Sequence, residues 1–325
     1  AAAAAGKHNT FNASDYGAVG DDQSDNTVAF SACLKALVAE GGGRMYIPPG
    51  IYQGRIAIPP VDTDSRWMTV EIAGDVEPTP TFGTEGSAAI PQHLTVVRSL
   101  AKSGPAVISA TNHSSGFSGV YVVITNLGIR TYDNPRIDGV DLAFARQCKL
   151  ENVVINTGVY DVQASEPTHG TRGLVTPACN NGALTLLRNV AVTGFHTGIV
   201  VNEHTDGDAV SLYANVHGAS FLRANHASRF GRLGAYRNAY HLTVLGLHGF
   251  SIQQLAIENA GPGQIAATNA WQKLKKDIND PENHGMGDVT YWVVEGNVGP
   301  VRNFSKLGGA GIQARRIGSP PVCAA

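Results

Sequence analysis

Charged residues are scarce in this sequence: they make up 15% of its 325 residues, against roughly 25% in an average soluble domain. Lysine and arginine number 24, aspartate and glutamate 26, and the net charge is -2. Such a chain has no general attraction for nucleic acid or for an anionic membrane. Long apolar runs are missing too, because the longest, interrupted run at 120–129 falls short of the roughly 18 to 20 residues that cross a bilayer. We therefore expect neither nucleic acid nor a membrane as a partner.

Cysteines are equally few. There are four, Cys33, Cys148, Cys179 and Cys323, and no two form a C-x-x-C pair. A disulfide scaffold and a zinc or redox motif are therefore not indicated. Cys33 and Cys148 stand among apolar residues and are predicted to be buried thiols. The alanine-rich start lacks the features of a signal peptide and predicts a flexible segment over residues 1–10.

Turn-forming residues are abundant, with 38 glycines and 16 prolines, which favours many short strands. One helix is predicted over residues 26–39, where apolar residues recur at helical spacing and Asp25 or Asn26 can cap the start. Strands are expected around 45–47 and 51–52, on either side of a Pro-Pro-Gly turn. A second helix is expected at the surface over residues 270–278.

A short pattern with Asn or Gln in its middle repeats along the chain. It occurs at 124–129, 150–155, 187–192 and 252–257, and more loosely at 212–216, with its polar members at Asn126, Asn152, Asn189, Asn215 and Gln254. Repeats of this kind predict the coils of a solenoid, about eight to eleven in number, whose stacked asparagines hydrogen-bond one another. The apolar residues Leu127, Val153, Val190 and Leu255 are then expected in one interior column.

The pattern predicts a single domain over residues 11–325. Residues 11–56 form the N-terminal cap and first coil, 57–265 the coils with protruding loops, and 266–325 the C-terminal cap. Glycine-rich segments near 296–299 and 308–309 predict that 289–294 and 311–316 pair as an antiparallel hairpin. The aperiodic stretches 59–66, 75–92 and 158–181 are expected to be loops.

Three blocks near the N-terminus carry a specific motif. They are D-Y-G-A-V-G-D-D at 15–22, S-D-N-T-V-A-F at 24–30 and G-G-G-R-M-Y-I-P-P-G-I-Y at 41–52. Together with the repeats behind them, they resemble the pectate-lyase-like superfamily. The resemblance implies an all-β fold, a single-stranded right-handed parallel β-helix with an N-terminal capping helix and a C-terminal β-hairpin cap. It implies less about activity, because members include polysaccharide lyases, glycoside hydrolases, bacteriophage tailspikes and virion appendages.

Acidic residues suggest one candidate site. Glycoside hydrolysis needs two carboxyl groups flanking the bond. Glu203, Asp206 and Asp208 cluster after a predicted strand, and Asp206 and Asp208 point the same way if the backbone is extended, roughly 6 to 7 Å apart. Asp141 could join them from another coil. A polar turn and solvated carboxylates are the structural alternatives, and the Gly-His-Gly and Arg-Ile-Lys segments of the polygalacturonase branch are absent.

A basic and aromatic stretch suggests the second candidate site, a surface that binds an acidic glycan. Its members are Arg229, Arg232, Tyr236, Arg237, Tyr240 and His241. Arginine can hold a uronate carboxylate, and Tyr or His can carry the proton that elimination requires. An ordinary solvated coil face is the alternative. The histidines at 169, 217, 226 and 248 show no ligand-like spacing and are expected at the surface or in loops.

Two functions remain open at this point. One is a polysaccharide lyase or glycoside hydrolase, and the other is a non-catalytic bacteriophage protein, a head decoration or tail appendage, that binds or shields a surface. Either would be extracellular or on a virion surface. In the phage setting we expect a homotrimer that contacts capsid or tail proteins. No metal is expected in the site, and Asp21, Asp22 and Asp25 are assigned to turns and helix capping, with a structural or catalytic calcium ion as the open alternative.

Overall fold

The computed structural model describes most of the chain up to residue 258 and three short strands beyond it. The described residues are 9–61, 68–75, 94–110, 119–131, 136–157, 171–178, 184–202, 204–215, 217–221, 228–236, 238, 240–244, 249–258, 288–289, 292–295 and 314–316. The expected helix at 270–278 and most residues of the expected loops lie outside them. The expected loop 158–181 is wrong near its end, because Arg172–Val175 form a strand. No helix in the described part is long and apolar enough to cross a membrane.

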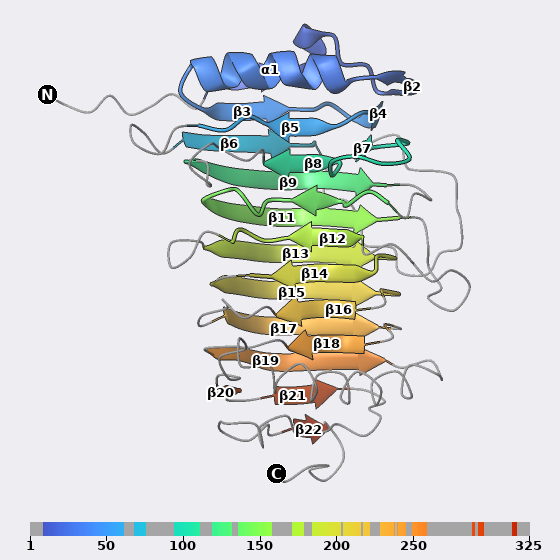
Figure 1. The fold of residues 1–325 in the computed structure, drawn as a ribbon, viewed down its shortest axis with the longest axis vertical. Coiled ribbons are helices and arrows are strands. Elements are labelled where there is room, and N and C mark those ends of the chain that lie inside the picture. Colours follow the sequence, from blue (N-terminus) through green and yellow to red (C-terminus); the bar gives the residue numbers. More distant parts are fainter. Residues whose placement is uncertain are drawn as a thin grey trace, which may run out of the picture.

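The described strands form two sheets that run along the long axis of the molecule (Figure 1). The main path of the larger sheet is β1 (Thr10–Asn12), β3 (Gly43–Tyr46), β6 (Met68–Ala73), β9 (Val120–Arg130), β11 (Gln147–Asn156), β13 (Thr185–Thr193), β15 (Thr205–Tyr213), β17 (Ser228–Tyr236), β19 (Gly249–Glu258), β21 (Trp292–Glu295) and β22 (Ala314–Arg316). Beside it lie β2 (Asp21–Asp25), β4 (Gly50–Gln53), β7 (Thr95–Arg98) and β20 (Asp288–Val289).

The smaller sheet has seven strands. In chain order they are β5 (Ile56–Ile58), β8 (Ile108–Ala110), β10 (Val140–Asp141), β12 (Arg172–Val175), β14 (Thr197–Val201), β16 (His217–Phe221) and β18 (Tyr240–Val244). Neighbouring strands in both sheets are parallel, and from β9 to β19 the chain alternates between the sheets. This is the expected parallel β-helix, with each coil stacked on the previous one.

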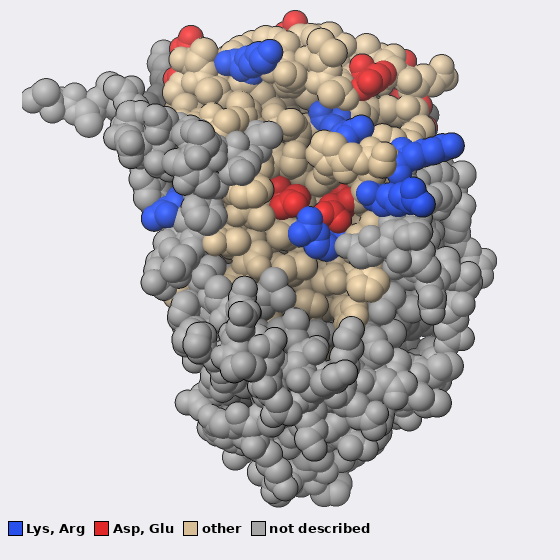
Figure 2. Space-filling model, viewed as in Figure 1, with Lys and Arg blue, Asp and Glu red and all other residues tan. Residues whose placement is uncertain are grey.

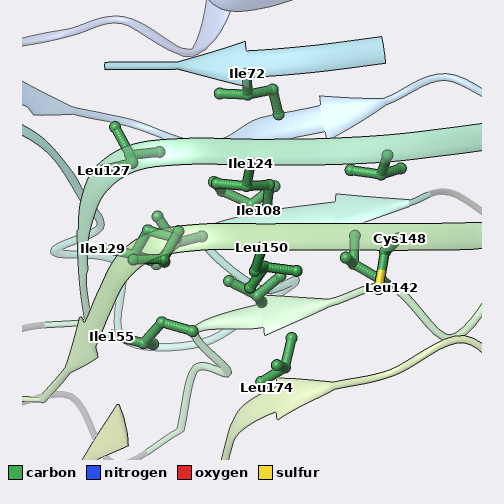
Figure 3. Packing of buried hydrophobic residues seen from close by; sticks show 14 of the residues in the cluster. Ile72, Ile108, Ile124, Leu127, Ile129, Leu142, Cys148, Leu150, Ile155 and Leu174 are labelled. Atoms are coloured by element: carbon green, nitrogen blue, oxygen red, sulfur yellow. The ribbon is translucent and has the colours of Figure 1, made fainter. Parts of the chain in front are cut away.

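Apolar side chains from the coils fill the interior. Leu127 lies opposite Val153, and Val153 opposite Val190, and all three are buried as predicted. Leu255 continues the same backbone column opposite Leu233, while its side chain lies outside the described part. Figure 3 shows this packing, with Leu150, Ile124 and Ile72 stacked between the sheets. The core is therefore built rung upon rung.

Both predicted thiols are buried in the core. Burial raises the pKa of Cys148 and of Cys33 to about 12 in each case. A buried thiol with so high a pKa carries almost no thiolate near neutral pH.

The long strands bend at the asparagine ladder. Asn126, Asn152 and Asn189 have φ values of 53°, 55° and 52°, in the left-handed region that asparagine tolerates better than most residues. The Asn152 side-chain amide donates to Asn126 Oδ1 at 3.0 Å, and that of Asn189 donates to Asn152 Oδ1 at 3.1 Å. The predicted structural role of these asparagines is confirmed.

The ladder does not continue through Asn215 as the repeat spacing suggested. Val190 lies opposite Val210, so the residue that stacks on Asn189 in the next coil is Ala209. Ala209 has a φ of 53°, close to the φ values of the ladder asparagines. Asn215 belongs to a separate buried stack, in which its amide donates to Asn238 Oδ1 at 3.0 Å. The coil after Asn189 is shorter than the earlier coils. A spacing taken from the earlier coils therefore leads to Asn215, which lies beyond the bend.

The predicted N-terminal helix is α1 (Thr27–Ala39), which lies across the N-terminal end of the stack (Figure 1). Asn26 is buried, and its side chain bonds to the backbone of Val19 and Gln53. Asp25 accepts hydrogen bonds from the backbone N–H of Thr27 at 2.9 Å and from its hydroxyl at 2.6 Å. The hydroxyl bond first and the backbone bond second hold the Asp25 pKa below its ordinary value. Asp25 rather than Asn26 thus caps the helix start.

At the other end, the predicted hairpin is wrong in its pairing. Strands β21 and β22 pair in parallel, with Trp292 opposite Ala314, and β21 also pairs in parallel with β19. A parallel pair continues the coils, because the strands of consecutive rungs run in the same direction.

Candidate functional site

A charged cluster lies at the middle of the smaller sheet, where β10 and β12 are adjacent. Arg172 Nε donates to Asp138 Oδ2 at 2.9 Å, and its Nη2 donates to the same oxygen and to Asp141 Oδ2 at 3.0 Å. The Arg172 backbone N–H also donates to Asp138 Oδ1 at 2.7 Å. One guanidinium therefore joins two carboxylates from the preceding coil. Figure 2 shows acidic and basic side chains side by side near the middle of the face in view.

The environment of Arg172 keeps it charged. Burial by itself lowers the pKa of Arg172, but the hydrogen bond and charge of Asp138 and the charge of Asp141 outweigh it and raise the pKa above its ordinary value. The side chain still exposes 37% of its surface. The two N–H groups on Nη1 take no part in the bonds to Asp138 and Asp141.

Histidines lie on the two coils that follow. Arg172 is opposite Thr197, Thr197 is opposite His217, and His217 is opposite Tyr240. The rings of His196 and His217 are 5.2 Å apart between centroids. We call Asp138, Arg172, Thr197 and His217, with the backbone position of Tyr240, the polar row. It places carboxylate, guanidinium, hydroxyl and imidazole groups, in that order, on four successive rungs of one sheet.

Glycines explain why these side chains stand where they do. Asp138, Arg172, Thr197 and His217 are each followed by a glycine, namely Gly139, Gly173, Gly198 and Gly218. A Cβ on Gly173 would lie 2.2 Å from Val192 Cγ1 and 2.6 Å from the Gly198 carbonyl oxygen, and Gly139 is similarly crowded by Ile155. No side chain fits there. The repeated order polar, glycine, apolar is the sequence signal that could have identified Arg172 and His217, which sequence reasoning missed as site residues.

The predicted acidic pair lies on the larger sheet. Asp206 and Asp208 belong to β15, and the buried Gly207 between them is consistent with both pointing outward, as predicted. Asp206 lies between two arginines, with Oδ1 3.4 Å from Arg188 Nη1 and Oδ2 3.0 Å from Arg229 Nη2. Asp208 is exposed, and its carboxylate lies over Gly231. The structure thus brings β15 and β17 together as the sequence indicated.

The remaining candidates are divided between the sheets. Asp141 bonds to Arg172 in the smaller sheet and does not join Asp206 and Asp208 in the larger one. Arg232 is exposed on β17, and Tyr236 is half-buried at its end. Tyr240 and His241 lie in β18 of the smaller sheet, and their side chains, like Glu203 and Arg237 as a whole, lie outside the described residues. The basic stretch is therefore not one surface, because the chain turns from one sheet to the other within it.

The acidic residues near the N-terminus have structural partners. Asp21 accepts hydrogen bonds from the backbone of Gln23 and Ser24, and Asp22 forms an ion pair with Arg98 at 2.7 Å. Within the described residues, no group of three or more His, Cys, Asp or Glu side chains is arranged to hold a metal ion.

Comparison with known proteins identifies the family. The model of the rhamnogalacturonase A/epimerase, pectate lyase-like family matches residues 10–229, more than half of the chain. The chain therefore belongs to this family, and the expected pectate-lyase-like parallel β-helix is confirmed.

Individual relatives match over shorter stretches or at low identity. Mannuronan C5-epimerase AlgE6 of Azotobacter vinelandii is 46% identical over 52 residues, which are 16% of this chain and 6% of that enzyme. The catalytic unit of a GH87 α-1,3-glucanase from Streptomyces thermodiastaticus superposes with a TM-score of 0.51 at 14% identity, over 90% of this chain and 48% of that one. The enzymatically active domain of tailspike protein 2 from bacteriophage CBA120 gives 0.47 at 10% identity, over 96% and 46%. The chain spans less than half of either structure.

Proposed function

We propose that this protein binds an acidic polysaccharide along the outer face of the smaller sheet and cleaves it by elimination at the polar row. The observation that carries the proposal is the cluster in which Arg172 bonds to both Asp138 and Asp141, on the same sheet as the paired rings of His196 and His217 on the next two coils. Membership of a family named for rhamnogalacturonase and epimerase supports a polysaccharide as the ligand. So does the short, closely similar stretch in a mannuronan epimerase.

The chemistry of elimination fits these side chains. The reaction removes the proton next to the uronate carboxylate, forms a carbon–carbon double bond and expels the glycosidic oxygen, which takes up a proton. A cation must neutralise the carboxylate, and Arg172 supplies one through Nη1. His217 is the candidate base that takes the proton, and Asp138 and Asp141 hold the guanidinium in place.

Hydrolysis at β15 is the second candidate function. It is favoured by Asp206 and Asp208, which are two residues apart on one strand, so their carboxyl groups lie roughly 6 to 7 Å apart. That separation lies at the lower end of the range of about 6.5 to 9.5 Å used by inverting glycosidases, where a water molecule fits between the two groups. Arg188, Arg229 and Arg232 would then bind the acidic substituents of the glycan.

The setting of the protein is part of the proposal. We place it outside the cell or on a virion surface, where long polysaccharides are encountered. In a virion, the β-helices would pack side by side as a homotrimer and contact capsid or tail proteins. A non-catalytic decoration or tail protein that uses the same surface for binding is the alternative within this setting.

A turnover screen separates these functions. Polymannuronate, polygalacturonate and capsular polysaccharides are incubated with the protein while absorbance near ~235 nm reports the unsaturated product and reducing ends report any cleavage. We expect absorbance to rise, and Arg172→Ala and His217→Ala to lower kcat by about 10²-fold or more. Arg44→Ala is the matched control, because it also removes an arginine from an ion pair, with Glu71 in the larger sheet.

The outcomes discriminate clearly. Reducing ends without absorbance, abolished by Asp208→Asn, would support hydrolysis at β15 instead. Binding without any turnover would support the non-catalytic alternative. Loss of activity in Arg44→Ala to the same degree as in Arg172→Ala would show that the polar row has no special role.

A further inference from the structure

One carboxylate of the charged cluster also fixes a neighbouring turn. Asp141 Oδ2 accepts from Arg172 Nη2 at 3.0 Å, and Asp141 Oδ1 accepts from the backbone N–H of Ala143 at 3.0 Å. The turn is closed by a bond from the Ala145 N–H to the Leu142 carbonyl at 2.9 Å. It is tied to the following coil by a bond from the Ala178 N–H to the Ala143 carbonyl at 3.1 Å. Asp141 thus connects the guanidinium to a rigid turn.

This turn presents an aromatic ring to solvent. Phe144 exposes 36% of its surface, although Leu142 and Ala145 on either side are completely buried. These two neighbours occupy the core, and the anchored backbone between them holds Phe144 outside it. The ring therefore stays at the surface, and Asp141 of the cluster precedes it by three residues in the chain.

We infer that Phe144 is a stacking platform for a sugar ring of the polysaccharide, next to the sugar whose carboxylate meets Arg172, and that Asp141 positions both contacts. The inference rests on the proposed function and adds a specificity-determining residue to it. The C–H groups on one face of a pyranose carry partial positive charge and pack against the negative face of an aromatic ring. A rigidly held ring gains more from this contact than a mobile one, because less entropy is lost on binding.

Affinity measurements test the platform. Binding of polymannuronate and polygalacturonate is measured by affinity electrophoresis, and KM and kcat are measured on whichever polymer is cleaved. Phe144→Ala should weaken binding and raise KM about threefold to tenfold with kcat nearly unchanged, and Phe144→Trp should retain affinity. Val28→Ala is the matched control, since Val28 is an exposed apolar residue on α1, with 80% of its surface accessible.

Substitutions of Asp141 test its positioning role. Asp141→Asn keeps an oxygen that can accept from Ala143 but loses the charge that faces Arg172, so it should lower kcat while sparing affinity. Asp141→Ala removes both contacts and should lower kcat and affinity together. An effect confined to thermal stability in both variants would contradict positioning.

The results test the Phe144 platform separately from the proposed function. If the wild-type protein binds a polymer and Phe144→Ala binds it equally well, the platform is wrong while the proposed function stands. If Arg172→Ala is also without effect on binding and turnover, the proposed site is wrong as well. If wild type binds none of the polymers tested, both are overturned.

Discussion

The guanidinium of Arg172 is 2.9 Å from the carboxylate of Asp138, measured between Nε and Oδ2, although 34 residues separate the two in the chain. Their approach follows from the stacking of consecutive coils, which places β12 next to β10. Residues far apart in sequence thus form one site because each coil contributes one position to it.

Replacing Gly173 by alanine should destabilise the fold by about 1 to 3 kcal/mol. The added Cβ would lie 2.2 Å from Val192 Cγ1 and 2.6 Å from a backbone oxygen, and neither can move without disturbing the next coil. Urea-induced unfolding measures the change. Gly231→Ala is the control, because the three atoms nearest to its added Cβ all belong to the exposed side chain of Asp208, which can rotate away. Equal costs at the two positions would contradict the packing described here.

Replacing Asn152 by alanine should cost about 2 to 3 kcal/mol of unfolding free energy. The change removes hydrogen bonds to Asn126 and Asn189 and leaves alanine with a φ near 55°. Asn152→Gly removes the same bonds without the backbone strain and should cost about 1 kcal/mol less. Chemical denaturation of the two variants gives both values, and a glycine variant no more stable than the alanine variant would argue against strain at the bend.

The capping role of Asp25 predicts a pH dependence of stability. Its pKa in the folded protein lies below the unfolded value of 3.8, so its contribution to stability is present above the unfolded pKa and is lost as pH falls through the folded one. The gap in unfolding free energy between wild type and Asp25→Ala should therefore shrink in acid.

An NMR titration of the Asp25 carboxyl gives a direct check of this cause. Thr27→Val removes the hydroxyl that donates to Asp25 at 2.6 Å, so the pKa should rise toward its ordinary value. An unchanged pKa in this variant would assign the shift to another group.

The fold was predictable from sequence where a local repeat carried the information. Asn126, Asn152 and Asn189 repeat with apolar neighbours at fixed offsets, and Leu127, Val153 and Val190 therefore aligned as expected. The same spacing failed at Asn215, because coil length varies and the spacing alone does not say which residue lies at the bend.

The site was predictable only within a single pair of neighbouring strands. Asp206 and Arg229 lie on consecutive rungs of the larger sheet, so sequence proximity indicated their contact. Asp141 was expected beside Asp206 and Asp208 but lies in the smaller sheet. Sequence spacing does not show where each coil turns from one sheet to the other. Gly139, Gly173 and Gly198, which follow Asp138, Arg172 and Thr197, each mark a position where the backbone approaches the core too closely for a side chain.

The most direct test of the central claim is an experimental structure of the protein soaked with a short oligouronide made from a polymer that it binds or cleaves. We predict ordered sugar density over the polar row, with a sugar carboxylate within hydrogen-bonding distance of Arg172 Nη1. Density over Asp206, Asp208 and Arg229, with none along the smaller sheet, would contradict the account and place the site on the other sheet.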